Sequence, residues 1–115
     1  ANFIPEQEVF GPESGDVLVL SWGGTYGSVF SAVSQAQKEG KSVAHAHVRY
    51  LNPLPRNLEA LLKNYKRILV PELNMGQLSH IIQSTYGIEV ESFNKIQGQP
   101  FKIRELTDAI DALLA

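Results

Sequence analysis

A glycine-rich turn, Gly23 to Ser28 (GGTYGS), has the composition best suited to holding a ligand. It follows a short apolar run, 17–20, and precedes apolar residues at helical spacing over 29–36, so it joins a strand to a helix. Backbone N–H groups at a helix start favour negative charge, and Thr25 and Ser28 add hydroxyls. The segment lacks the lysine of a phosphate-binding loop and does not match the dinucleotide fingerprint. Two interpretations stay open, an anion cradle and an ordinary tight turn.

Two histidines, His45 and His47, stand two residues apart on a predicted strand and therefore share one of its faces. A zinc site would need at least one more ligand nearby. The remaining histidine, His80, lies on a predicted helix, and nothing in the sequence brings it to the pair. We therefore expect packed, hydrogen-bonded histidines rather than a metal site.

Glu72 directly follows a buried strand and precedes a predicted helix. Its carboxylate could act as a general acid or base, or could accept hydrogen bonds at the helix N-terminus. No second acid, histidine or nucleophile stands beside it in a known motif, and no serine lies in G-x-S-x-G, which favours the structural role. Asn74 and Gln77 have the spacing of a capping box at the start of the same helix. The sequence shows no complete catalytic constellation.

The elements that must position these groups alternate strand and helix, which predicts an α/β fold with a mostly parallel sheet covered on both faces. We predict strands over 8–10, 17–20, 42–48, 66–71 and 88–93, and helices with inner faces in 29–36, 58–65, 75–86 and 103–113. The first strand has only a loop before its successor and is expected to run antiparallel near an edge. The last helix is expected to bury Ile103, Leu106, Ile110 and Leu113.

Length and composition narrow the class of protein. A chain of 115 residues argues for one domain, which we place at 16–115, with 1–15 as a linker containing a possible edge strand. The absence of cysteine excludes disulfides and thiolate metal sites and fits a cytoplasmic location. Ten basic and twelve acidic residues leave no electrostatic footprint for nucleic acid or a membrane. The abrupt start is typical of a fragment of a larger polypeptide.

Four segments in this order resemble a known family: 21–27 (SWGGTYG), 47–55 (HVRYLNPLP), 70–78 (VPELNMGQL) and 94–101 (NKIQGQPF). Together they are similar to the carboxyl-terminal domain of the alpha subunit of 2-oxoacid:ferredoxin oxidoreductases, with the 2-oxoglutarate type closest. More distantly, 51–54 resembles the carboxyl-terminal domain of transketolases and 2-oxoacid dehydrogenases. The resemblance covers nearly everything from Asp16 onward. It implies a three-layer α/β/α sandwich whose mixed, mostly parallel five-stranded sheet has its first strand antiparallel.

The resemblance also implies what the complete enzyme does. Such an enzyme oxidatively decarboxylates a 2-oxoacid on thiamine diphosphate with magnesium, transfers the acyl group to coenzyme A, and passes electrons through iron–sulfur clusters to ferredoxin. The thiamine site of the family lies between another alpha-subunit domain and the beta subunit, so no cofactor is expected in this domain. Its implied role is to organise subunits and line the approach to the active site. Lys102 departs from the family, in which a threonine able to cap the last helix is frequent.

The edge where the parallel strands end is expected to face the rest of such an enzyme. Aromatic and arginine side chains, which interfaces favour, are among its residues. The candidate interface residues are Trp22, Gly23, Gly24, Thr25, Tyr26, Arg49, Tyr50, Asn52, Glu72, Asn74 and Gln77. Two other classes of function stay open. One is a self-contained module that binds a phosphate or coenzyme A through 23–28; the other is a flavodoxin- or receiver-like signalling domain, with Glu72 as its only candidate phosphoacceptor.

Overall fold

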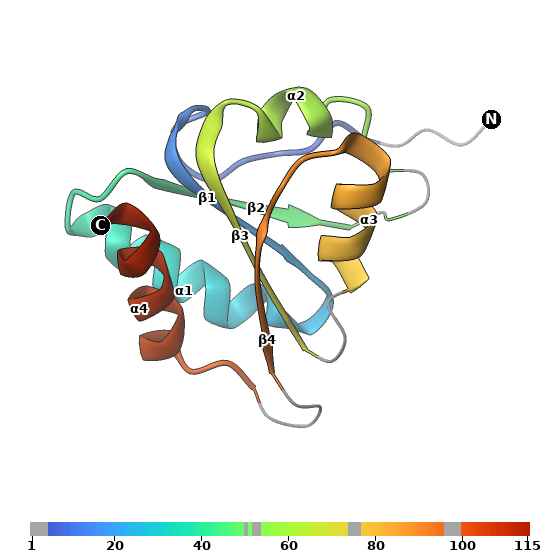
Figure 1. Ribbon diagram of the computed structural model, residues 1–115. Coiled ribbons are helices and arrows are strands. Elements are labelled where there is room, and N and C mark those ends of the chain that lie inside the picture. The colour runs from blue at the N-terminus through green and yellow to red at the C-terminus, as the bar shows by residue number, and fades with distance from the viewer. Residues whose placement is uncertain (1–4, 50, 52–53, 74–76, 96–99) are drawn as a thin grey trace.

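The computed structural model describes residues 5–49, 51, 54–73, 77–95 and 100–115 (Figure 1). Strands and helices alternate along these ranges as the sequence predicts. The elements are β1 (Gly15–Trp22), a 3-10 turn η1 (Gly23–Thr25), α1 (Tyr26–Lys38), β2 (Val43–Val48), α2 (Leu58–Leu62), β3 (Tyr65–Leu73), α3 (Gln77–Tyr86), β4 (Glu91–Lys95) and α4 (Ile103–Leu114).

The four strands form a parallel sheet in the order β2-β1-β3-β4. The central strand β1 is apolar at every position from Val17 to Leu20, and these four side chains are almost completely buried. A strand covered on both faces requires this pattern. The sheet register sets Ser21 opposite His47 and Trp22 opposite Val48, so β1 and β2 end side by side.

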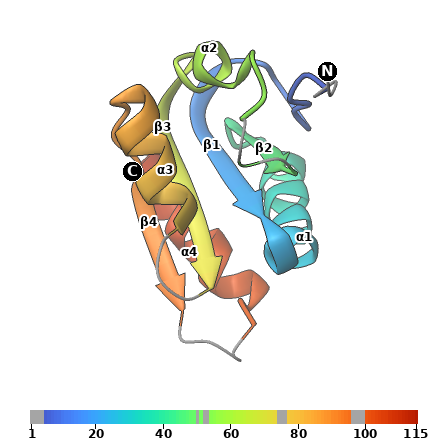
Figure 2. The ribbon, with the colours of Figure 1, turned by 90° about the vertical axis from the view of Figure 1, so that its right-hand side faces the viewer.

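Helices cover both faces of the sheet (Figures 1 and 2). One apolar cluster contains the buried residues of α2 and α3, among them Leu58, Leu62 and Ile82. The other contains those of α1 and α4, including Val29 and Ile110. The predicted three-layer α/β/α class is confirmed.

The prediction of five strands is wrong, because among the described residues the sheet has four and the first predicted strand is reduced to a single antiparallel bridge. The Phe10 N–H donates to the His45 carbonyl oxygen at 2.7 Å, and the His45 N–H donates back at 3.1 Å. The chain then leaves the sheet through Gly11, whose φ of +115° suits glycine alone. The predicted antiparallel direction and edge position do hold at this bridge. Beside it, the amide nitrogens of Gln37 and Gln7 donate to the carbonyl oxygens of Val43 and His47.

Several strand boundaries differ from the prediction, and two of the differences have a clear physical reason. The strand predicted over 66–71 was expected to stop at Pro71, whereas β3 continues to Leu73. It pairs with β1 only as far as Leu69 and with β4 from there on, so a proline without an N–H falls where the strand has one neighbour. The strand predicted to begin at Ile88 begins instead at Glu91, as β4, and Val90 packs into the core on the α2 and α3 side.

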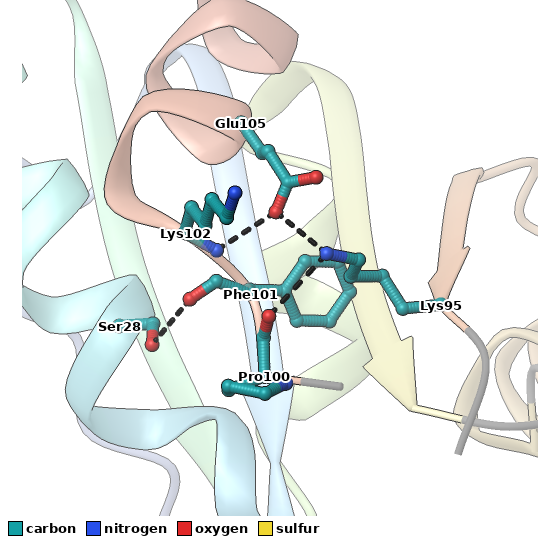
Figure 3. A network of polar contacts seen from close by, with 6 residues as sticks. All are labelled: Ser28, Lys95, Pro100, Phe101, Lys102 and Glu105. Atoms are coloured by element: carbon teal, nitrogen blue, oxygen red, sulfur yellow. Dashed lines mark hydrogen bonds and ion pairs between the residues drawn. The ribbon is translucent and has the colours of Figure 1, made fainter. Parts of the chain in front are cut away.

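Helix α4 is attached to the domain at its first turn (Figure 3). Glu105 accepts the backbone N–H of Lys102 at 2.8 Å and the ammonium of Lys95 at 2.9 Å. Ser28 in α1 donates to the carbonyl oxygen of Phe101 at 3.0 Å. The burial predicted for Leu106 and Ile110 is confirmed, with both at most 1% exposed.

The burial predicted for Ile103 is wrong, because its side chain is 43% exposed. Phe101, which is 5% exposed, fills the apolar cluster just before the helix begins. The side chain of the first helical residue is therefore not needed to cover this part of the sheet. Leu113, also predicted to be buried, is partly buried against the same cluster.

Candidate functional site

The carboxyl ends of β1 and β2 place the glycine-rich turn beside Arg49. Gly23 has a φ of +63°, which favours glycine, and a Cβ added at Gly23 or Gly24 would meet nothing within 4 Å. The hydroxyl of Thr25 donates to the carbonyl oxygen of Trp22 at 3.0 Å, and Thr25 is 4% exposed. This hydroxyl therefore serves the turn itself rather than a bound anion.

Glu72 joins two elements at this edge. It is 1% exposed, and Trp22 Nε1 donates to its Oε1 at 2.8 Å. The N–H groups of Leu78 and Ser79 at the start of α3 donate to it at 2.6 and 3.0 Å, and the Ser79 hydroxyl adds a fourth bond at 2.9 Å. The predicted structural role, a carboxylate at a helix N-terminus, is confirmed. Because this carboxylate is buried and already accepts four bonds, it is poorly placed for acid–base or phosphoacceptor chemistry.

Ser21, His45 and His47, at the ends of β1 and β2, form a hydrogen-bonded group that the sequence analysis missed. The hydroxyl of Ser21 lies 2.7 Å from His45 Nε2 and 2.9 Å from His47 Nδ1. One hydroxyl proton serves one ring, so Ser21 donates to one imidazole and accepts from the other. The prediction that the two histidines are packed and hydrogen-bonded is confirmed. The sequence does show that His45 and His47 share one face of their strand. That Ser21 of the neighbouring strand lies on the same face beside them follows only from the β1–β2 register.

The protonation of these histidines is set mainly by burial. Burial, with a smaller contribution from the neighbouring His47, lowers the pKa of His45 to about 4. Burial, followed by the nearby charge of Arg49, also lowers the pKa of His47. His45 is therefore neutral at pH 7, and its Nδ1 has no hydrogen-bond partner among the described residues.

A serine hydroxyl beside a histidine can be activated as a nucleophile. Ser21 is completely buried, however, so a substrate cannot reach its hydroxyl in this conformation. In the described residues, neither imidazole is hydrogen-bonded to a carboxylate that would orient it as a general base. The group is better suited to fixing the ends of β1 and β2 than to covalent catalysis.

Neither a metal site nor a membrane-spanning helix is found among the described residues. Across 5–49, 51, 54–73, 77–95 and 100–115, no three histidine or acidic side chains come together as a group that could hold a metal ion. Nor does any helix within those ranges combine the length and apolar character needed to cross a bilayer.

Three exposed aromatic rings cover the two histidines. Phe10, Tyr26 and Phe30 are 38%, 37% and 41% exposed, and the ring centre of Tyr26 lies 4.9 Å from that of His47. A cavity of about 240 Å³ lies between Phe10, Tyr26, His47, Arg49 and the segment 5–8. A second cavity, of about 360 Å³, lies between Phe10, Phe30, Gln37 and His45.

The structure brings several of the predicted interface residues together. Trp22 is half-buried and hydrogen-bonded to Glu72, while Tyr26 and Arg49 line the same cavity. Gly23, Gly24, Tyr26, Arg49 and Gln77 are exposed. Thr25 and Glu72 are buried and serve the domain itself. The predictions for Tyr50, Asn52 and Asn74, including the Asn74 capping box, concern residues outside the described ranges.

Comparison with known proteins gives a consistent result. Residues 15–106 match the family described as pyruvate:ferredoxin oxidoreductase core domain II. The chain is 40% identical over 113 residues to the 2-oxoglutarate oxidoreductase subunit KorA of Mycobacterium tuberculosis, covering 97% of the chain and 17% of that protein. It is 28% identical over 117 residues to the 2-oxoacid:ferredoxin oxidoreductase subunit alpha of Saccharolobus solfataricus, covering 96% of the chain and 18% of that protein.

Solved structures agree. The 2-oxoglutarate:ferredoxin oxidoreductase of Magnetococcus marinus, with 2-oxoglutarate, coenzyme A and succinyl-CoA bound, superposes with a TM-score of 0.91 at 30% identity over 98% of this chain and 20% of that chain. A split-gene transketolase in an inactive beta4 tetramer superposes with a TM-score of 0.67 at 16% identity, over 88% of this chain and 39% of that one, which shows a shared fold. The chain thus spans about a fifth of the length of the three 2-oxoacid oxidoreductase chains named above.

Proposed function

The chain belongs to the pyruvate:ferredoxin oxidoreductase core domain II family, and from that premise we propose that it is a non-catalytic assembly domain in the alpha subunit of a 2-oxoacid:ferredoxin oxidoreductase. The observation that carries the proposal is the 40% identity, over 97% of the chain, to a 2-oxoglutarate oxidoreductase subunit. We accordingly propose 2-oxoglutarate as the 2-oxoacid of the complete enzyme, with oxidative decarboxylation to the acyl-CoA as its reaction.

The cofactors of that reaction belong, in this proposal, to other parts of the enzyme. The chain has no cysteine to hold an iron–sulfur cluster. Among the described residues, no three acidic or histidine side chains form a group that could hold a metal ion. The proposal assigns no step of the reaction to this domain. Thiamine diphosphate with magnesium, the clusters and coenzyme A would be bound by the complete enzyme.

The contribution of the domain would be made at the edge where β1 and β2 end. Gly23, Gly24, Tyr26 and Arg49 lie there with exposed surface that a partner could contact. The proposed partners are the remaining domains of the alpha subunit, the beta subunit and, through the complete complex, ferredoxin. The proposed location is the cytoplasm, which fits a chain without cysteine.

The test uses the complete alpha and beta subunits, co-expressed, with Arg49→Glu in the alpha subunit. We expect reduced assembly in sedimentation analysis and reduced dye reduction with 2-oxoglutarate and coenzyme A, while the thermal stability of the domain stays unchanged because Arg49 is exposed. The matched control is Arg67→Glu, an exposed arginine near the amino end of β3. Equal behaviour of the two variants would refute the proposed interface.

A stand-alone ligand-binding module is the competing function, and calorimetry separates the two. We expect no heat of binding when coenzyme A or thiamine diphosphate is titrated into the isolated chain, and no turnover by that chain alone. Binding of coenzyme A that is weakened by Gly24→Asp would favour the module, because this change adds negative charge at an exposed position of the glycine-rich turn.

A further inference from the structure

An aromatic patch formed by Phe10, Tyr26 and Phe30 is the largest gathering of exposed apolar side chains in the described part of the chain. Four large apolar residues there are exposed, and the patch contains three of them; the fourth is Ile103 on α4. The ring centres of Tyr26 and Phe30 lie 5.7 Å apart and those of Phe10 and Phe30 lie 5.9 Å apart, so the rings form one continuous surface. Contiguous apolar surface of this kind marks interaction sites in soluble proteins.

The shape of the patch favours a protein partner over a flat surface. The two cavities described above lie on either side of Phe10, one shared with Tyr26 and the other with Phe30. Alternating rings and hollows accept side chains that interdigitate with them, as in the centre of a protein–protein interface. Aromatic residues in such centres contribute a large share of binding energy.

The charges around the patch indicate the chemistry of the partner. Among the described residues that line the first cavity, Glu6 and Glu8 are accompanied by one cation, Arg49, and His47 in the same wall has a lowered pKa. The formal balance of this wall at neutral pH is two negative charges against one positive. A basic side chain is therefore the complementary group to enter it.

We propose that the aromatic patch docks an apolar surface, carrying a lysine or arginine, from the part of the alpha subunit that this chain does not contain. The inference rests on the proposed function and deepens it. The relatives supply the reason for this occupant, since about four-fifths of their length lies outside the matched region. Tyr26 and Arg49 also belong to the proposed interface edge, so the patch extends that edge along α1 and the segment before β1.

The test compares Phe30→Ser with Ile103→Ser in the complete alpha subunit co-expressed with the beta subunit. The two side chains are 41% and 43% exposed, so the variants remove similar exposed apolar groups from different helices. In the complete alpha subunit, we expect Phe30→Ser to raise the hydrogen exchange of α1 at least about tenfold, because docking is weakened, and Ile103→Ser to leave this exchange unchanged. Equal exchange of α1 in the two variants would overturn the inference. If Phe30→Ser has no specific effect but Arg49→Glu still impairs assembly, the proposed function stands and only this inference is rejected. If neither Phe30→Ser nor Arg49→Glu has an effect, both the inference and the proposed function are rejected.

A charge-reversal pair tests the chemistry of the partner. Glu8→Lys should raise the hydrogen exchange of α1 in the complete alpha subunit, whereas Glu13→Lys, at another exposed glutamate in the segment before β1, should not. Hydrogen exchange also shows which surface the partner covers, and we expect stronger protection of α1 in the complex than in the isolated chain. Concentration-dependent dimerisation of the isolated chain that Phe30→Ser abolishes would overturn the proposed occupant in favour of a second copy.

Discussion

The indole nitrogen of Trp22 donates to the carboxylate of Glu72 across 2.8 Å and thereby connects the end of β1 to the beginning of α3. The two residues are 50 positions apart in the chain. The same carboxylate accepts both backbone N–H groups of Leu78 and Ser79, so one buried side chain connects a strand, its neighbour and a helix.

Replacing this carboxylate should destabilise the domain strongly. Hydrogen bonds to charged groups contribute about 1.5–3 kcal/mol each, and Glu72→Ala leaves the indole, two backbone N–H groups and the Ser79 hydroxyl without their acceptor. We expect the free energy of unfolding in urea to fall by about 3 kcal/mol or more. Glu89→Ala removes an exposed glutamate and should have little effect. A comparable loss of stability in both variants would contradict the role of Glu72 as the acceptor at the start of α3.

The buried histidine should make stability depend on pH. The pKa of His45 is about 4 in the folded domain, below the ordinary value of 6.5. Between these values the unfolded chain binds more protons, so the free energy of unfolding decreases as the pH falls from 6.5 towards 4. The full contribution of such a shift is about 3 kcal/mol. His45→Leu should flatten the profile measured by urea unfolding, whereas His80→Gln should not; an unchanged slope in His45→Leu would exclude this origin.

Helix α4 should depend on Ile110 and not on Ile103. Ile110 is completely buried and Ile103 is 43% exposed, although both were predicted on one inner face. Truncating a buried isoleucine to alanine costs about 2–5 kcal/mol, whereas exposed positions usually change stability by less than about 0.5 kcal/mol. Thermal unfolding of Ile110→Ala and Ile103→Ala measures the difference. Similar melting temperatures would mean that α4 does not dock as described.

The start of α4 leaves room for a stabilising change. Glu105 already accepts the backbone N–H of Lys102, which is half of a capping box, and this bond is the main cause of the lowered pKa of Glu105. A threonine hydroxyl could supply the other half by accepting the N–H of residue 105. We expect Lys102→Thr to raise the free energy of unfolding by about 0.5–1 kcal/mol. Lys102→Ala, which removes the same charge without adding a hydroxyl, is the control, and equal effects would reject the capping explanation.

Local patterns were sufficient to predict the framework. The continuous apolar run of β1 predicted a strand buried on both faces, and the position of Glu72 before a helix favoured its structural role. Both depend on neighbours in the sequence. Such features follow from propensity, periodicity and the polar groups of helix ends.

Features set by pairing across the sheet were harder to predict. The hydrogen bonds of Ser21 to two histidines require β1 and β2 in one particular register, which no local pattern specifies. The exposure of Ile103 depends on Phe101 filling the core ahead of the helix. The sequence predicted which segments lie at the edge where the strands end, but not which of their side chains are exposed. In the structure, Glu72 and Thr25 are buried and stabilise the domain, whereas Tyr26 and Arg49 are exposed.

The contacts along the outer side of β2 have a consequence for solubility. VAHAHV is a hexapeptide without Asp, Glu, Lys, Arg, proline or glycine, and low charge and the absence of proline favour aggregation as intermolecular β-structure. Three carbonyl oxygens on its open side, those of Val43, His45 and His47, already accept bonds from Gln37, Phe10 and Gln7. The segment before β1, together with Gln37 of α1, thus shields this edge against edge-to-edge association. A protease that cut between Phe10 and β1 would release this shield, and the nicked domain would be expected to precipitate while its core is still folded.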